Sequence, residues 1–337
     1  MAFSASTGSA GELSAFEARK PVFIGNNAAE SNNTAASWYT IEASQISAPD
    51  GVSDYTGGTS SQTDNASYPS SRAYDRHNHL VTRPTDATKR GYALVFDLQE
   101  DTTISAIVLA GHNLSTAKVN ANFNVSVYVS SSADFSSYTR LARWTGSNIT
   151  DDKPLTAYGL GTGHVNSTQD TSNWYDVTSV RYLQIAFYQT DSNNLTTMPQ
   201  LGEVFIGTRR QLSAQPNLPL STKVTRSNIV DFNAKSGVVS RYVMNTGQKV
   251  YPDLTWEGDG SDGYGLDDIG TLESFFKSDI THGTKPFFYA PDPVTNPREI
   301  YFMLLEDAEF GAQNVFGPDT ETVSLSMTEV SPFYSSL

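Results

Sequence analysis

Residues 123–129 alternate apolar and polar side chains, and this alternation constrains the fold more than any other feature of the chain. A period of two is that of a β-strand with one buried face. Residues 183–187 repeat the pattern, whereas residues 104–110 are almost continuously apolar, as expected for a strand in the middle of a packed sandwich. Clusters of Gly, Asn, Ser and Asp with turn chemistry separate these segments. The first half of the chain is therefore predicted to be β.

Composition excludes several classes of protein. The 337 residues suffice for two domains with a core each. The absence of cysteine excludes disulfides, thiolate metal sites and a cysteine nucleophile. A net charge of −14, with no stripe of Lys and Arg, repels phosphates, so we expect no nucleic acid partner. No apolar run approaches the length of a membrane span and the N-terminus lacks a signal-peptide layout, so we expect no membrane partner.

Two segments of low periodicity divide the chain. Residues 209–220 contain two prolines and are predicted to form an extended linker. Residues 1–28 are rich in Ser, Ala and Gly, and we expect an N-terminal arm that lies on a neighbour rather than in a core. The remaining ranges, 29–208 and 221–337, are the two expected domains.

The order of motifs in the first domain resembles a known family. The motifs are Ala73-Tyr-Asp75, Gly91-Tyr-Ala-Leu-Val-Phe-Asp-Leu98, Thr103-Ile-Ser-Ala-Ile-Val-Leu109, Val180-Arg-Tyr-Leu-Gln-Ile-Ala-Phe187 and Leu201-Gly-Glu-Val-Phe-Ile-Gly207. This order resembles the galactose-binding-like sandwiches of the discoidin (coagulation factor 5/8 type C) family, from about residue 30 to residue 208. The resemblance implies a jelly-roll β-sandwich.

The second domain combines strands with one helix. Asp267 or Asp268 stands where a helix N-cap is expected, and the apolar residues that follow share one helical face. The spacing predicts a helix over about 268–277, with Ile269, Leu272 and Phe276 buried against a sheet. Strand candidates lie on both sides of it, so the domain is expected to be β-rich with one packed helix.

This order also resembles a known class of modules. The helix is followed by Lys285-Pro-Phe-Phe-Tyr-Ala-Pro-Asp-Pro293, a hydrophobic strand, and an alternating strand that ends Thr328-Glu-Val330. The order is similar to the tail-tube-type domain of tailed-bacteriophage distal and minor tail proteins, a β-sandwich or barrel with one packed helix. The resemblance implies a homo-oligomeric ring, with six copies favoured over three, and contacts with tail tube, hub or fibre proteins. It also implies a virion location after synthesis in the host bacterial cytoplasm.

The sequence nominates no catalytic residue. No serine lies in a Gly-x-Ser-x-Gly elbow, and the paired carboxylates are typical of helix caps and solvated turns. The acidic, glycine-rich residues 257–268 fail the EF-hand template. A hairpin tip or subunit-contacting loop is the favoured interpretation of them, and a hard-cation loop is the alternative. We expect no enzyme and no cofactor.

The discoidin-like resemblance implies one metal site. Many such sandwiches hold a structural calcium between the Asp turn and the late Glu strand, which here corresponds to Asp75, Asn78 and Glu203. Arg76 stands where the family has a small residue, and its guanidinium would compete with a cation. The alternative is a calcium-free domain in which Arg76 or another cation pairs with Asp75.

Glycan recognition would need aromatic platforms beside polar loops. The candidates lie in or beside the Gly-, Thr- and Asn-rich residues 145–176. They are Trp144, Tyr158, His164, Trp174 and Tyr175. The alternative is that the tryptophans pack in the core or at a sheet edge, as large aromatic residues usually do.

Three classes of function follow from these patterns. The leading one is a structural component of a phage tail, which acts by self-assembly and by docking neighbouring virion proteins. The alternative is a carbohydrate-binding module protein that recognises a cell-surface glycan on a host. An enzyme such as a glycosidase would need two placed carboxylates in a cleft, and the sequence nominates no such pair.

Overall fold

The chain is mainly β, as predicted, and it divides into two compact units. Unit 1 contains Asn26–Arg209, and unit 2 contains Ala18–Gly25 together with Arg210–Leu337. The computed structural model describes residues 21–30, 34–42, 45–47, 54–55, 61–76, 80–85, 89–118, 120–159, 174–175, 178–211, 216, 221–225, 228–233, 239–245, 249–258, 266–293, 299–306, 313–314 and 321–330.

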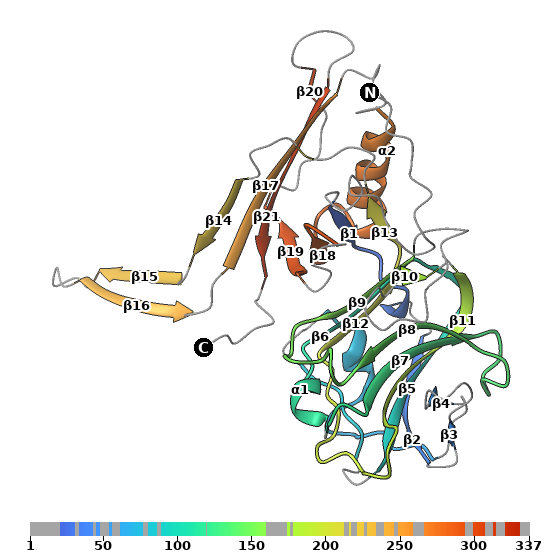
Figure 1. The fold of residues 1–337 in the computed structure, drawn as a ribbon. Coiled ribbons are helices and arrows are strands. Elements are labelled where there is room, and N and C mark those ends of the chain that lie inside the picture. The colour runs from blue at the N-terminus through green and yellow to red at the C-terminus, as the bar shows by residue number, and fades with distance from the viewer. Residues whose placement is uncertain are drawn as a thin grey trace. The chain divides into compact units, whose positions relative to one another are not determined.

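Unit 1 is a β-sandwich of two sheets (Figure 1). The antiparallel five-stranded sheet has the order β2 (Ala35–Ile41), β5 (Gly91–Ile104), β11 (Thr178–Gln189), β7 (Phe123–Ser130), β8 (Thr139–Thr145). The four-stranded sheet has the order β10 (Trp174–Tyr175), β9 (Leu155–Gly159), β6 (Ala106–Ala110), β12 (Glu203–Gly207). The short elements are η2 (Ala28–Glu30), β3 (Ile46–Ser47), β4 (Asp54–Tyr55), η4 (Ser70–Tyr74) and α1 (Leu114–Ala117).

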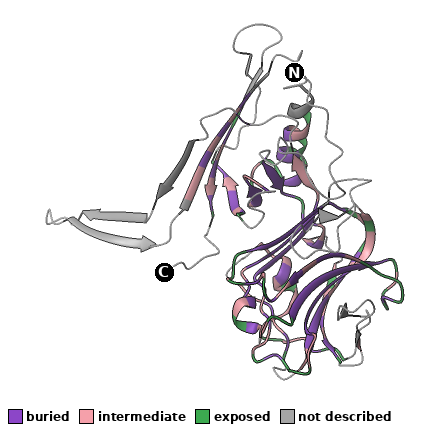
Figure 2. Cartoon of the chain, viewed as in Figure 1, coloured by how far each residue is buried: buried purple, intermediate pink, exposed green. Residues whose placement is uncertain are grey.

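The two sheets share one hydrophobic core, which appears as the purple interior in Figure 2. The predicted alternation in β7 is confirmed, because Phe123, Val125, Val127 and Val129 all point into this core. The intervening residues of β7 are buried as well, which the alternation did not predict. The reason is a second apolar cluster on the other face of the five-stranded sheet, to which Tyr128 belongs.

The Asp-Leu and Arg-Tyr-Leu motifs meet across β5 and β11. The guanidinium of Arg181 donates to both carboxylate oxygens of Asp97, at 2.7 and 2.9 Å. The strand register shifts at this point, between Val180 and Tyr182. The bidentate pair therefore joins the two strands where regular pairing breaks.

Unit 2 contains an eight-stranded sheet with one helix packed against it (Figure 1). The order is β13 (Arg209–Gln211), β1 (Val22–Ile24), β18 (Phe287–Ala290), β19 (Tyr301–Leu305), β21 (Glu321–Glu329), β17 (Lys249–Gly258), β14 (Ser221–Thr225), and β20 (Gln313–Asn314) pairs with β21. The hairpin of β15 (Asn228–Asn233) and β16 (Val239–Asn245) is a separate two-stranded sheet.

The helix lies close to its predicted range. α2 (Leu266–Ser274) continues into a π-helical turn, η5 (Phe275–Asp279). Leu272 and Phe276 are buried, as predicted, in a core that also holds Phe275. The side chain of Ile269 lies outside the described residues.

The domain boundaries differ from expectation at two points. Val22–Ile24, expected in an arm, is fully buried and pairs antiparallel with β18. Arg209–Gln211, expected in a linker, is the edge strand β13, and Arg210 donates two hydrogen bonds to buried Asp279 at 2.7 and 3.1 Å. A three-residue strand carries too little pattern to reveal a partner that lies at the other end of the chain. Unit 1 is therefore inserted between β1 and the remaining strands of unit 2.

Candidate binding site

Three loops gather at one end of the unit 1 sandwich, which we call the loop end: residues 111–122, 146–154 and 190–202. Strand register places them together, because Gln189 pairs with Phe123, and Asn124 with Thr145. In the other sheet Glu203 pairs with Ala110. Loops that a rigid sandwich positions in this way are common places for binding residues.

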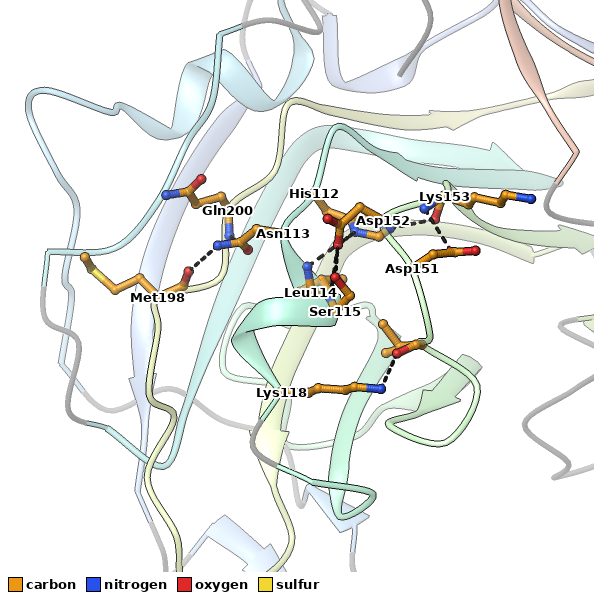
Figure 3. Close-up of polar contacts among 11 residues, drawn as sticks. His112, Asn113, Leu114, Ser115, Lys118, Asp151, Asp152, Lys153, Met198 and Gln200 are labelled. Carbon is orange, nitrogen blue, oxygen red and sulfur yellow. Dashed lines mark hydrogen bonds and ion pairs between the residues drawn. The ribbon is translucent and has the colours of Figure 1, made fainter. Parts of the chain in front are cut away.

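A polar cluster fixes the first two loops to each other (Figure 3). The buried imidazole of His112 bonds through Nε2 to the carbonyl of Lys153 at 2.8 Å. Asp152 Oδ1 accepts hydrogen bonds from the backbone N–H and the hydroxyl of Ser115, at 3.1 and 2.6 Å. Asp152 therefore caps the start of α1.

This cluster lacks the geometry of a catalytic triad. In a triad the imidazole lies between the carboxylate and the nucleophile and accepts the proton of the hydroxyl. Here Asp152 lies between, because Ser115 donates to it while His112 Nδ1 is 3.8 Å from the same oxygen. The hydroxyl of Ser115 donates to a carboxylate and not to the imidazole that activates the nucleophile of a triad. These contacts of the cluster hold the two loops together.

Two further side chains hold the loop end together (Figure 3). Asn113 donates to the carbonyl of Met198 at 3.0 Å and accepts from the backbone of Gln200 at 2.8 Å. Lys118 donates from Nζ to the carbonyls of Gly146 and Ile149 at 2.9 and 2.5 Å. All three loops are therefore cross-linked by side chains, which makes the loop end a preorganised surface.

A second polar group at the loop end is the Asp191 cluster, formed by Asn120, Asn122, Asp191 and Asn193. Asp191 Oδ2 accepts hydrogen bonds from the side-chain amides of Asn120, Asn122 and Asn193 at 2.8, 3.1 and 2.8 Å. Asn122 and Asn193 are exposed, and Asn120 and Asp191 are half-buried. Two loops thus present one carboxylate and three amides on a single patch.

Hydrogen bonds favour the charged form of Asp191. Partial burial alone would raise the pKa of Asp191, but the hydrogen bonds from the three asparagines outweigh burial and lower that pKa to about 2. The sequence alone did not predict the Asp191 cluster. A signal was present, because Asn120-Ala-Asn122 and Asp191-Ser-Asn193 have the same spacing, but nothing local indicates that the two segments meet.

Glu203 is the one residue of the expected calcium set with an unusual environment. It is fully buried, and neither carboxylate oxygen accepts a hydrogen bond. Burial raises the pKa of Glu203 well above its ordinary value, and Asp75 and Glu30 raise it further, while Arg76 acts in the opposite direction. Burial and the neighbouring carboxylates therefore favour the neutral form of Glu203. Asn78 lies outside the described residues.

The residues present do not fit a calcium ion. Arg76 has a left-handed backbone (φ 59°), pairs with Glu30, and lies 4.9 Å over the ring of Phe205. A guanidinium thus already supplies positive charge beside the carboxylates, and burial disfavours the charged form of Glu203 that a hard cation requires. Over the described ranges, no group of three or more His, Cys, Asp or Glu is placed to hold a metal. The metal-free alternative named Asp75 as the partner of Arg76, whereas the structure shows an ion pair between Arg76 and Glu30.

The predicted aromatic platform for a glycan includes two residues, of five, that are buried. Trp144 is 2% exposed and lies in the sandwich core, and Tyr158 on β9 is 0% exposed. A buried ring cannot stack on a ligand. His164 lies outside the described residues, and Trp174 and Tyr175 form β10, of which only the backbone is described. Recognition at the loop end would therefore depend on polar side chains.

No family model and no curated protein matches the chain. Solved structures match about half of it. Ruminococcus gnavus GH29 fucosidase in complex with fucose shares 12% identity over 54% of this chain and 26% of that chain (TM-score 0.34), so this chain spans about a quarter of that protein. CpGH89CBM32-6 produced by Clostridium perfringens shares 16% sequence identity, over 54% of this chain and 98% of that chain (TM-score 0.31). A Streptococcus pneumoniae fucose binding module, SpX-3, shares 14% sequence identity, over 54% of this chain and 98% of that chain (TM-score 0.30). None of these likenesses is strong enough to say what this chain binds.

Proposed function

We propose that unit 1 is a non-catalytic glycan-binding module and that the Asp191 cluster is its binding site. The observation that carries this proposal is the convergence of Asn120, Asn122 and Asn193 on Asp191 at the accessible loop end. Each saccharide hydroxyl both donates and accepts a hydrogen bond. A fixed carboxylate beside amides offers acceptors and donors at short spacing, which suits adjacent hydroxyls.

A binding role also agrees with the chemistry of the neighbouring polar residues. His112, Ser115 and Asp152 are engaged in holding loops, so they are unavailable for proton transfer. A glycosidase would require a carboxylic acid and a carboxylate on opposite sides of a scissile bond. Asp191 is the charged carboxylate of this patch, and no second one takes part in its hydrogen bonds. We therefore propose recognition without turnover.

Glycan-array binding by the full chain tests this function. Asp191→Asn and Asn193→Ala should each lower the affinity for a bound glycan about tenfold or more, which corresponds to the loss of one charge-assisted hydrogen bond. Asp134→Asn is the matched control. Asp134 caps a comparable turn between β7 and β8, accepting from the Ser132 hydroxyl and the Ser136 backbone at 2.8 and 3.0 Å. Equal affinity in all variants, or no binding to any glycan, would exclude the site.

A second candidate function is assembly, in which unit 2 forms a ring in a phage tail and presents unit 1. The observation in its favour is the hairpin of β15 and β16, which among the described strands pair only with each other. An isolated two-stranded hairpin is marginally stable in water, so contact with another chain would stabilise it. The insertion of unit 1 into unit 2 suits a displayed module on a scaffold.

The assembly candidate is tested by native mass spectrometry and electron microscopy of the full chain. We expect a closed ring, with six copies favoured over three, since heterologous contacts that do not close would give fibres. Replacement of residues 228–245 by a short Gly-Ser turn should leave monomers that keep any glycan binding. A monomeric wild-type chain, alone and in a purified virion, would rule assembly out while leaving the glycan proposal intact.

A further inference from the structure

Two arginines of unit 1 lie over one tyrosine ring. The guanidinium carbon of Arg83 is 3.7 Å from the ring centroid of Tyr68, and that of Arg72 is 5.8 Å from the same centroid. Arg72 lies in η4, and Arg83 lies in the segment that follows it. All three side chains are partly exposed. Two positive charges therefore share one small patch, which we call the Arg72–Arg83 pair.

The backbone beneath this patch is tied to the core. The Arg83 N–H and the Thr82 hydroxyl both donate to the carbonyl of Tyr68, at 3.4 and 3.2 Å. Thr82 also accepts a hydrogen bond of 2.8 Å from the indole of buried Trp38, and it exchanges two backbone hydrogen bonds with Leu201. The patch therefore stands on a fixed base, and stacking on Tyr68 holds the plane of the Arg83 guanidinium.

The charges of the pair are not neutralised within the described part of the chain. Arg76, Arg181 and Arg210 each pair with a carboxylate. Neither Arg72 nor Arg83 has a carboxylate partner there, and Nε of Arg83 is buried without a hydrogen-bond acceptor. The chain has a net charge of −14 and carboxylates in excess, yet none of the described carboxylates pairs with either of these two arginines at Tyr68. An external anion would provide acceptors for their terminal N–H groups.

We propose that the Arg72–Arg83 pair binds the carboxylate or sulfate group of an acidic saccharide. The planar fork of a guanidinium donates two parallel hydrogen bonds to such groups, and because Nε of Arg83 is buried, the terminal N–H groups are the donors offered to an anion. The inference rests on the proposed glycan-binding function of unit 1 and gives that function an acidic ligand. The overall negative charge of the chain opposes approach of an anion, so binding depends on short-range contact with the two arginines.

Calorimetric titration of the full chain with two oligosaccharides tests the proposal. One contains glucuronate, and its matched counterpart has each carboxylate reduced to a primary alcohol. We expect about tenfold tighter binding of the acidic form, the size of one charge-assisted hydrogen bond. The preference should vanish in the double variant Arg72→Gln, Arg83→Gln. Arg181→Gln, which removes an arginine already paired with Asp97, is the matched control and should keep the preference.

Two further arms identify the source of the anion and separate this inference from the glycan proposal. Inorganic sulfate alone should compete weakly with the acidic oligosaccharide in the wild type and not in the double variant. Equal affinity for the acidic and neutral forms in the wild type would overturn the acidic-ligand inference and leave glycan binding standing. Sulfate binding without binding of any saccharide would overturn both proposals.

Discussion

The side-chain amide of Asn27 donates a hydrogen bond of 3.1 Å to the carbonyl of Val204, 177 residues further along the chain. Its oxygen accepts from the backbone of Ile206 at 3.1 Å and from that of Ala29 at 3.2 Å. One buried side chain thus joins the first and last segments of unit 1. The ends of the inserted unit lie side by side, and Asn27 is part of its fold.

The first prediction concerns this boundary. A fragment of residues 26–209 should unfold cooperatively and be more stable than a fragment of residues 29–209, which lacks Asn27. The expected difference is about 1–3 kcal/mol, because the carbonyl of Val204 and the N–H of Ile206 would lose their partner. Urea denaturation followed by tryptophan fluorescence measures it. Asn27→Ala in the longer fragment should reproduce the loss, whereas Asn65→Ala, at a surface turn, should not. Equal stability of both fragments would contradict this role of Asn27.

The second prediction concerns β1. Phe23 is fully buried in unit 2, with ring centroids 5.4 Å from Phe275 and 5.5 Å from Tyr289. Phe23→Ala should destabilise unit 2 by about 3–5 kcal/mol through the cavity it leaves. Scanning calorimetry of the full chain should show a lower midpoint for the unit 2 transition and an unchanged one for unit 1. Phe276→Ala should act on the same transition. A shift confined to the unit 1 transition would show that the N-terminal strand belongs elsewhere.

The third prediction concerns the positive charge that Arg76 supplies beside the acidic residues. Arg76→Gly suits the left-handed backbone but removes the positive charge beside Glu30, Asp75 and Glu203. We expect a loss of about 3 kcal/mol, and partial recovery on addition of Ca²⁺. The wild type should respond neither to Ca²⁺ nor to a chelator.

Gln99→Gly is the control for this experiment, since Gln99 also has a positive φ, of 69°, but is not among the residues that act on Glu203. It should neither lose stability nor respond to Ca²⁺. Thermal melting with Ca²⁺ or with a chelator measures all three proteins. A wild-type midpoint that rises with Ca²⁺ would show that a metal binds despite Arg76.

The fourth prediction concerns the pH dependence of stability. The pKa of Glu203 is raised in the folded state, so the folded protein holds a proton that the unfolded chain releases above its ordinary pKa. The contribution of Glu203 is fully favourable below that ordinary pKa and is lost as the pH rises through the folded pKa. The slope from this one group cannot exceed about 1.4 kcal/mol per pH unit.

Glu203→Gln keeps the shape of the neutral acid and removes the titration. Urea midpoints should be measured from about pH 4 to about pH 8. The midpoint of the variant should rise relative to that of the wild type as the pH rises above the ordinary glutamate pKa. Glu42→Gln, at an exposed position, should run parallel to the wild type. A constant difference between Glu203→Gln and the wild type would mean that Glu203 is charged in the folded protein.

Local patterns account for most of the elements in this structure. The alternation in β7 and the helical spacing around Leu272 and Phe276 predicted both the elements and the faces they bury. These signals are local, because a strand or helix exposes its apolar side chains at a period set by its own geometry. β1 was expected in an arm, because its three residues carry no repeated pattern.

The candidate site was not predictable in the same way. Trp144 and Tyr158 have the chemistry of a glycan platform, but both side chains are buried in the fold. Asn120 and Asp191 form the accessible patch only because β7 and β11 pair with Gln189 beside Phe123. Residue type indicates what a side chain can bind, whereas burial and strand register decide whether a ligand can reach it.

The sequence by itself therefore determined that the chain is mainly β, that it is long enough for two units, that one helix packs in the second domain, and that cysteine chemistry is absent. Only the tertiary structure decided that β1 completes the sheet of unit 2, that Glu203 is buried beside Arg76, and that the two asparagine-containing loops converge on Asp191. The physical reason is the range of the interactions. Backbone periodicity acts over a few residues, while the burial of a charge and the meeting of loops depend on contacts between segments far apart in the chain.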